Sequence, residues 1–178
     1  MLNESTLKNI ATQLYDLAEG VQRTVIEASH QLSIPFAAIH EENRATLKKN
    51  LETLCTAKGR YIYRFSVAQE VSEQLHKAFF EAKAAKKNNR AYCRVNEASS
   101  LLYVGSSSSL HSRIQQHLGF GNRGTYAMQL SHWLPAVEGE LSIEAWHFGP
   151  AVDGAVLQAI EDGLWAINKP MFGRQGAR

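Results

Sequence analysis

A compact run of polar residues between Arg90 and His117 has the composition of a site that handles phosphate. Tyr92 and Tyr103 are 11 residues apart, Arg113 follows Tyr103 by ten, and His117 follows Arg113 by four. A phenol can orient a water, or deprotonate it if its pKa is lowered. A guanidinium fork suits the extra negative charge of a phosphoryl transition state. The order of these residues therefore predicts a phosphate site.

Two short strands and a helix are expected to position these side chains. Residues 91–95 and 101–104 are rich in aromatic and β-branched residues, and the residues between them are typical of a turn. This pattern predicts an antiparallel hairpin. A helix over residues 110–118 follows, and Arg113 and His117 share one of its faces.

Further elements are predicted on both sides of this unit. Residues 60–67 alternate as a strand does, and 71–87 form an amphipathic pattern that predicts a helix. Residues 141–148 predict the third strand of the sheet. A helix over 154–167 carries an apolar stripe, and Glu161 lies at the edge of that stripe, where a carboxylate can be fixed and still reach a cleft. The fold class is therefore α+β, with a small, mainly antiparallel three-stranded sheet flanked by helices.

Residues 1–57 are predicted to form a helical N-terminal region, and 58–178 the second domain. Apolar residues recur at helical spacing from Leu7 to Leu17, and residues 21–32 and 41–54 predict two more helices. This region fits a small bundle or packing arm. The alternative is an element for target recognition or dimerisation, and the sequence is compatible with a homodimer.

Charge and composition narrow the class of protein. The first 57 residues hold five Lys/Arg and seven Asp/Glu, whereas the remaining residues hold fourteen and ten, a balance of +4 that suits a polyanionic partner. No apolar run approaches a membrane span, and the N-terminus lacks the pattern of a secretory signal. Cys55 and Cys93 lie far apart and form no C-x-x-C pair. A cytoplasmic protein with no membrane partner is expected.

The order and spacing of these motifs resemble the GIY-YIG nuclease family over roughly residues 90–175. Tyr103-Val104-Gly105 is similar to the family's second motif. The first motif is matched at Tyr92, with Arg90 where the family usually has glycine. The segment Gly59-Arg60-Tyr61 is a rival, because it keeps a glycine and a tyrosine, but it requires a long insertion before Tyr103.

The family's third element is a glutamate on a later helix, and Glu161 occupies that place. Many members have an asparagine twelve residues after the glutamate. This chain has Gly173 there, and Asn168 is the nearby candidate to replace it.

The resemblance implies a metal-dependent DNA endonuclease, and restriction, repair, mobility and phage defence are all compatible with it as a role. Glu161 would hold Mg²⁺ or Mn²⁺, and Arg113 would stabilise the charge of the transition state. Tyr92 would act on the attacking water, Tyr103 would hold the phosphate or its waters, and His117 would serve as a proton relay or phosphate contact. The alternative is a nucleic-acid-binding module that keeps the fold but cleaves weakly, because the first-motif glycine and the later asparagine are missing.

Overall fold

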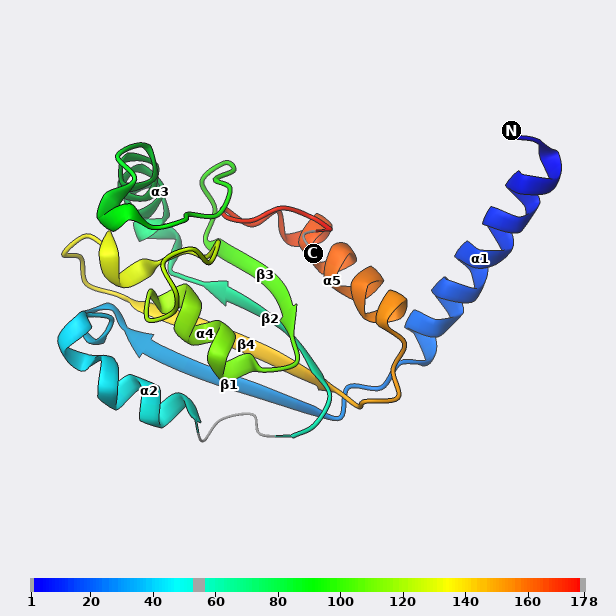
Figure 1. The fold of residues 1–178 in the computed structure, drawn as a ribbon, viewed down its shortest axis with the longest axis horizontal. Coiled ribbons are helices and arrows are strands. Elements are labelled where there is room, and N and C mark those ends of the chain that lie inside the picture. Colours follow the sequence, from blue (N-terminus) through cyan, green and yellow to red (C-terminus); the bar gives the residue numbers. More distant parts are fainter. Residues whose placement is uncertain (1, 53–56, 177–178) are drawn as a thin grey trace.

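The computed structural model describes residues 2–52 and 57–176, and its centre is a four-stranded antiparallel sheet (Figure 1). The strands lie in the order β1-β4-β2-β3. Their bounds are β1 Ala28–Pro35, β2 Arg60–Ser66, β3 Leu101–Ser107 and β4 Glu140–Phe148. The predictions of strands over 60–67 and 141–148 are confirmed.

The expectation of a three-stranded sheet is wrong, because β1 adds a strand that the sequence conceals. β1 lies at the edge of the sheet and pairs only with β4, from Ala28 opposite His147 to Pro35 opposite Glu140. Only Ile34 of this strand is buried, so its alternating pattern is diluted by polar residues. The expected helix over 21–32 is therefore replaced by the end of one helix and most of β1.

The predicted hairpin between 91–95 and 101–104 is also wrong. β3 pairs with β2, with Tyr63 opposite Gly105 and Phe65 opposite Tyr103. Residues 91–95 take part only in two isolated bridges, at Tyr92 and Val95. The partner of β3 is therefore β2, which precedes it in the chain by the whole of a helix, and not the adjacent residues 91–95.

The described residues form five α-helices, and all five lie close to where the sequence predicts a helix, including those expected from Leu7 to Leu17 and over 41–54. Helices were expected over 71–87, 110–118 and 154–167, and Asp153 caps the last of these by accepting a hydrogen bond from the Ala155 N–H at 2.7 Å. The bounds are α1 Glu4–Arg23, α2 Arg44–Glu52, α3 Gln69–Ala84, α4 Leu110–Leu118 and α5 Gly154–Asn168.

The helices cover opposite faces of the sheet. The main core lies on the face that carries α3 and α4, where Tyr63 and Phe65 of β2 belong to one buried cluster with Phe79 of α3 and Ile114 of α4. A smaller cluster on the other face joins Ile62 to Leu157 of α5 and to other residues. The edge strand β3 therefore lies between α4 and α5.

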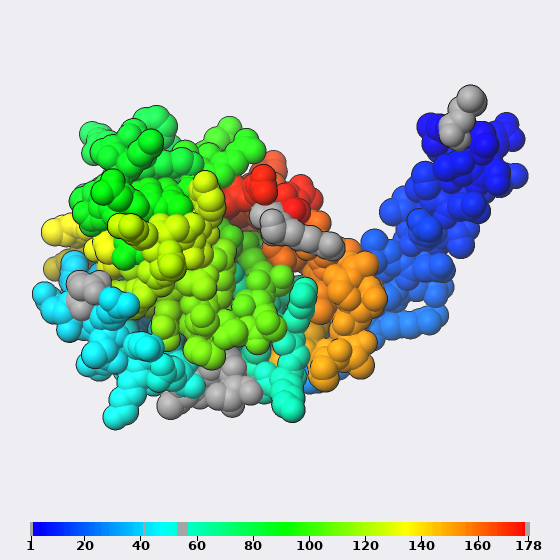
Figure 2. Space-filling view, in the orientation of Figure 1, coloured from blue at the N-terminus to red at the C-terminus, as the bar shows by residue number. Residues whose placement is uncertain are grey.

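Helix α1 projects away from the rest of the molecule (Figure 2). None of its residues is buried. Gly20 lies against Val156 of α5, and residues between Ile10 and Leu17 line a hollow beside the start of α5. Within the described ranges, no helix combines the length and the apolar character needed to cross a bilayer. Cys55 lies outside the described residues.

Candidate active site at the edge of strand β3

Two tyrosine rings lie side by side on neighbouring strands, and a glycine makes room for them. The rings of Tyr63 and Tyr103 are nearly parallel, with centroids 6.4 Å apart. Gly105 is directly opposite Tyr63 in the sheet. A Cβ atom at this position would lie 2.7 Å from the Tyr63 hydroxyl oxygen and 2.9 Å from a carbon of the Tyr103 ring. The glycine of the Tyr103-Val104-Gly105 motif is thus required for the approach of the two phenols.

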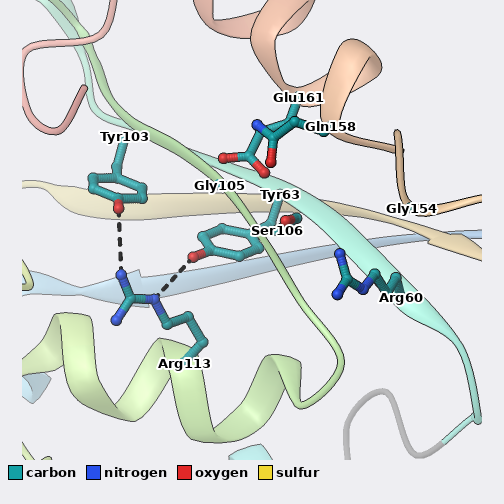
Figure 3. A pocket seen from close by; sticks show the side chains of 9 residues that line it. All are labelled: Arg60, Tyr63, Tyr103, Gly105, Ser106, Arg113, Gly154, Gln158 and Glu161. Atoms are coloured by element: carbon teal, nitrogen blue, oxygen red, sulfur yellow. Dashed lines mark hydrogen bonds between the residues drawn. The ribbon is translucent and has the colours of Figure 1, made fainter. Parts of the chain in front are cut away.

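Arg113 of α4 joins the two hydroxyl groups (Figure 3). Its Nε donates to the Tyr63 hydroxyl at 3.3 Å, and one Nη donates to the Tyr103 hydroxyl at 3.3 Å. The other Nη donates to Gln116 at 2.7 Å, which fixes the plane of the guanidinium. Burial opposes the charge of Arg113, but the two phenols outweigh this and raise its pKa. The site therefore holds a permanent, oriented positive charge.

His117 lies behind this group, fully buried one turn along α4. Burial lowers the pKa of His117 well below its usual value, so the ring is neutral. The Met128 N–H donates to its Nδ1 at 3.4 Å, which leaves the proton on Nε2. Nε2 faces the Tyr63 hydroxyl at 3.4 Å and therefore donates to it. Both lone pairs of this hydroxyl are then occupied, by His117 and Arg113, and its own hydrogen is left for the open side of the site.

The two phenols are donors, not bases. Burial, followed by the neighbouring Tyr103, raises the pKa of Tyr63 above its usual range. Burial also raises the pKa of Tyr103, although Arg113 opposes the shift. Both groups are protonated at neutral pH. They can orient a water or a phosphate oxygen, but they do not deprotonate one unaided.

Glu161 comes from α5, on the opposite face of the sheet, and reaches the same cavity past the edge of β3 (Figure 3). Burial and the neighbouring Asp162 raise the pKa of its carboxyl, whereas Ser106 lowers it. Arg60 and Arg113 also favour the charged form. The cavity has a volume of about 410 Å³. Its lining residues are Arg60, Tyr63, Tyr103, Gly105, Ser106, Arg113, Gly154, Gln158 and Glu161.

The oxygen atoms on one wall of this cavity fit a magnesium ion. Among the described residues, no group of three or more His, Cys, Asp or Glu side chains forms a ready-made metal cage. Mg²⁺, however, commonly binds through one or two carboxylates, retained waters and the substrate's phosphate. Glu161 supplies the carboxylate, and Gln158 and Ser106, which line the same cavity, carry further side-chain oxygen atoms. These residues fit a magnesium ion whose remaining ligands are waters and phosphate oxygens of the substrate.

The structure brings together some of the predicted site residues and separates others. Tyr103, Arg113 and Glu161 line the cavity, and His117 supports it from behind without lining it. Tyr92 is elsewhere: its hydroxyl donates to the Lys87 carbonyl oxygen at 3.1 Å and its ring packs on Phe79. It is not beside the Tyr63 and Tyr103 hydroxyls because residues 91–95 do not pair with β3.

Tyr63 takes the place that was expected for Tyr92. The rival segment Gly59-Arg60-Tyr61 leads into β2, which is the strand that contains Tyr63. Tyr61 itself packs against His147, with ring centroids 4.8 Å apart, and does not line the cavity. A signal was present in the sequence: residues 60–67 form a strand, and alternate positions of a strand face one side. The sequence did not predict Arg60, Ser106 or Gln158 as site residues, although Gln158 precedes Glu161 by three helical positions.

Neither candidate for the family's late asparagine lies in the cavity. Asn168, at the end of α5, accepts a hydrogen bond from Arg64 at 3.2 Å and is not a lining residue. Gly173 has a left-handed φ of +92°, and a Cβ atom there would lie 2.9 Å from the Tyr103 ring. The glycine is required where the C-terminal segment passes the Tyr103 ring.

Comparisons with protein-family models, with curated proteins and with solved structures found no match to this chain. The cavity combines an oriented cation, two neutral phenol donors and one half-buried carboxylate. Such a set can bind a phosphate, orient a water and hold a divalent cation.

Proposed function

We propose that the chain is a metal-dependent DNA endonuclease of GIY-YIG type, with the β3-edge cavity as its active site. The observation that carries this proposal is the meeting of Tyr63, Tyr103, Arg113 and Glu161 around one cavity of about 410 Å³. These residues come from four different elements, and three of them were selected from sequence as a phosphodiesterase set. Tyr63 replaces Tyr92 as the first-motif tyrosine.

In this proposal Arg113 binds the scissile phosphate. Its guanidinium is already held by two phenols and Gln116, so little reorganisation is needed when charge develops on the phosphate oxygens. The Tyr63 hydroxyl, held from behind by His117 and Arg113, directs its hydrogen at a phosphate oxygen or at the attacking water. His117 is thus a positioning residue, since its Nε2 already carries a proton.

Glu161 and its neighbours hold the metal ion. A Mg²⁺ held by Glu161 would supply Lewis-acid stabilisation of the phosphate and would lower the pKa of a bound water. Glu161 must be ionised for this, and Arg60 and Arg113 favour that form against the cost of burial. Ser106, which also lines the cavity, favours the charged form of the carboxyl as well.

The alternative of a weakly cleaving DNA-binding module rests on two departures from the family pattern. Tyr61, two residues before Tyr63, and Gly173 stand where glycine and asparagine are expected. The two proposals predict different outcomes of one assay. Supercoiled plasmid is incubated with Mg²⁺ and with the wild-type chain, Glu161→Gln or Glu81→Gln, the last being a matched change on the exposed face of α3. The nuclease proposal expects efficient nicking by wild type and by Glu81→Gln but not by Glu161→Gln, whereas the binding module gives at most weak nicking with all three.

We also propose that α1 pairs antiparallel with α1 of a second copy. Its apolar stripe has alternate spacings of three and four residues, typical of a helix pair, and Leu7, Ile10 and Leu14 of this stripe are exposed. An antiparallel alignment places Leu7 opposite Leu17, and Ile10 opposite Leu14. The same alignment places Lys8 opposite Asp16, so the charges of the two helices are complementary. The stripe consists of Leu7, Ile10, Leu14, Leu17 and Val21.

A further inference from the structure

A second cavity adjoins the active site and shares a wall with it. Tyr103 and Arg113 line both cavities. A nucleic-acid strand bound at Arg113 can therefore extend from the active site into the second cavity. The second cavity has a volume of about 810 Å³, within the range of pockets that enclose small molecules. Its other lining residues are Lys83, Tyr92, Cys93, Arg94, Thr125, Tyr126, Gly173 and Arg174.

The lining of the second cavity is cationic. Lys83, Arg94 and Arg174 come from three separate segments, and with Arg113 they give four positive charges. No acidic side chain belongs to the lining as the structure describes it. Lys83 is fixed, because its Nζ donates to the Cys93 carbonyl oxygen at 2.7 Å, while Arg94 and Arg174 are exposed. This arrangement suits a polyanion that enters from solvent.

An exposed aromatic ring stands at this cationic cavity. The side chain of Tyr126 is 71% exposed, although it is a large and largely apolar group. Its backbone is connected to the active site, because Arg113 donates to the Tyr126 carbonyl oxygen at 3.5 Å. Cations that follow a sugar–phosphate chain, beside an aromatic face on which a base can stack, are the features that bind single-stranded nucleic acid.

The cysteine of the cavity does not point to covalent chemistry. Burial raises the pKa of Cys93 to about 12, so its thiol stays protonated at neutral pH. Tyr92 lines the cavity, but its hydroxyl already donates to the Lys87 carbonyl oxygen and its ring packs on Phe79. We therefore assign it no contact with a ligand beyond packing. What remains for a ligand is stacking on Tyr126 and contact with the cations.

We propose that the second cavity receives an unpaired nucleotide adjacent to the scissile phosphate, with its base stacked on Tyr126 and its phosphates on Arg94 and Arg174. The inference rests on the proposed nuclease function and specifies its substrate class. In an uninterrupted duplex the bases are paired and stacked inside the helix, and none enters the cavity without the cost of unstacking. The preferred substrate is therefore DNA with a single-stranded flap or branch.

Binding is tested separately from cleavage, by fluorescence anisotropy in the presence of a chelator. The probes are a labelled duplex with a single-stranded flap and the matching blunt duplex. Tyr126→Ala should weaken flap binding by roughly 5- to 150-fold, the equivalent of about 1–3 kcal/mol for one stacked base, and should leave blunt-duplex binding nearly unchanged. Tyr15→Ala is the matched control, because Tyr15 is 75% exposed on the distant helix α1.

The charged part of the cavity gives a second readout. The double variant Arg94→Gln/Arg174→Gln should weaken flap binding and flatten its dependence on salt, because fewer phosphate contacts release fewer counterions.

Equal affinity of wild type for flap and blunt duplex, or equal flap binding by the Tyr126 and Tyr15 variants, would overturn the inference. Flap binding through Tyr126 without any cleavage would instead overturn the nuclease function. Cleavage of both substrates at equal rates would overturn only the flap preference.

Discussion

Substitution of Gly105 by alanine isolates the contribution of the paired tyrosines. The added Cβ would lie 2.7 Å from the Tyr63 hydroxyl oxygen, 2.9 Å from the Tyr103 ring and 3.0 Å from the carbon that bears the Tyr63 hydroxyl. These atoms have little freedom to move, because both rings are buried and both hydroxyls are held by Arg113. Overpacking of this kind costs about 1–3 kcal/mol of stability. In a chain of this size that lowers Tm by roughly 2–12 °C.

The same change should affect catalysis more than stability. Displacement of the phenols moves them and Arg113 from the positions that face the phosphate, and a misplacement of about 1 Å can cost on the order of 10² in rate. The measurement is the rate of Mg²⁺-dependent nicking of supercoiled plasmid, at a temperature where melting curves show the variant folded.

Gly163→Ala is the matched control for Gly105→Ala. Gly163 is exposed in α5, and a Cβ there meets nothing within 4 Å. This variant should keep wild-type activity and gain about 1 kcal/mol, because alanine is the better helix former. A second variant, Gly105→Ala/Tyr63→Phe, removes the hydroxyl of the closest contact and should lose less stability than the sum of its single changes. Nicking by Gly105→Ala at the wild-type rate, with wild-type stability, would refute the reasoning about the tyrosine pair.

Two further predictions concern ionisation and assembly. Because burial raises the pKa of Glu161 above the ordinary 4.5, the folded state disfavours its charged form, and stability is lost as pH rises from the unfolded through the folded pKa. Glu161→Gln should therefore abolish nicking yet raise Tm at neutral pH. As the pH is lowered, nicking by wild type should begin to fall at a pH above the usual pKa of a glutamate, because the carboxyl must be ionised. An unchanged or lower Tm for Glu161→Gln would contradict the claim that burial of the charged carboxyl costs stability. Sedimentation equilibrium should give a dimer for wild type and for Tyr15→Asp, which lies off the apolar stripe, and a monomer for Leu14→Asp; a monomeric wild type would refute the α1 pairing.

The sequence was most informative where structure is local. Helix α4 has the predicted bounds, and α5 differs by one residue at its end, because caps and apolar periodicity are set within a few turns. Tyr103, Arg113 and Glu161, which were predicted as site residues from their order and spacing, line one cavity.

Long-range pairing could not be inferred in the same way. Local composition favoured a hairpin within residues 91–104, but β2 pairs with β3 across the whole of α3. That pairing puts Tyr63, and not Tyr92, beside Tyr103 and Arg113. The edge strand β1 was missed because it buries one residue only, and an edge strand needs little apolar patterning. The neutral state of the tyrosines depends on burial, which is a property of the assembled fold.

The rate of plasmid nicking by Tyr63→Phe and Tyr92→Phe, measured side by side with Mg²⁺, tests the central claim most directly. Each change removes one hydroxyl and keeps the ring and its packing. If the cavity at the edge of β3 is the active site, Tyr63→Phe should lose activity by on the order of 10², since it loses a donor aimed at the reacting phosphate. Tyr92→Phe should cleave nearly as wild type does, because its hydroxyl serves only the Lys87 carbonyl. Full activity in the Tyr63 variant, with loss in the Tyr92 variant, would contradict the account.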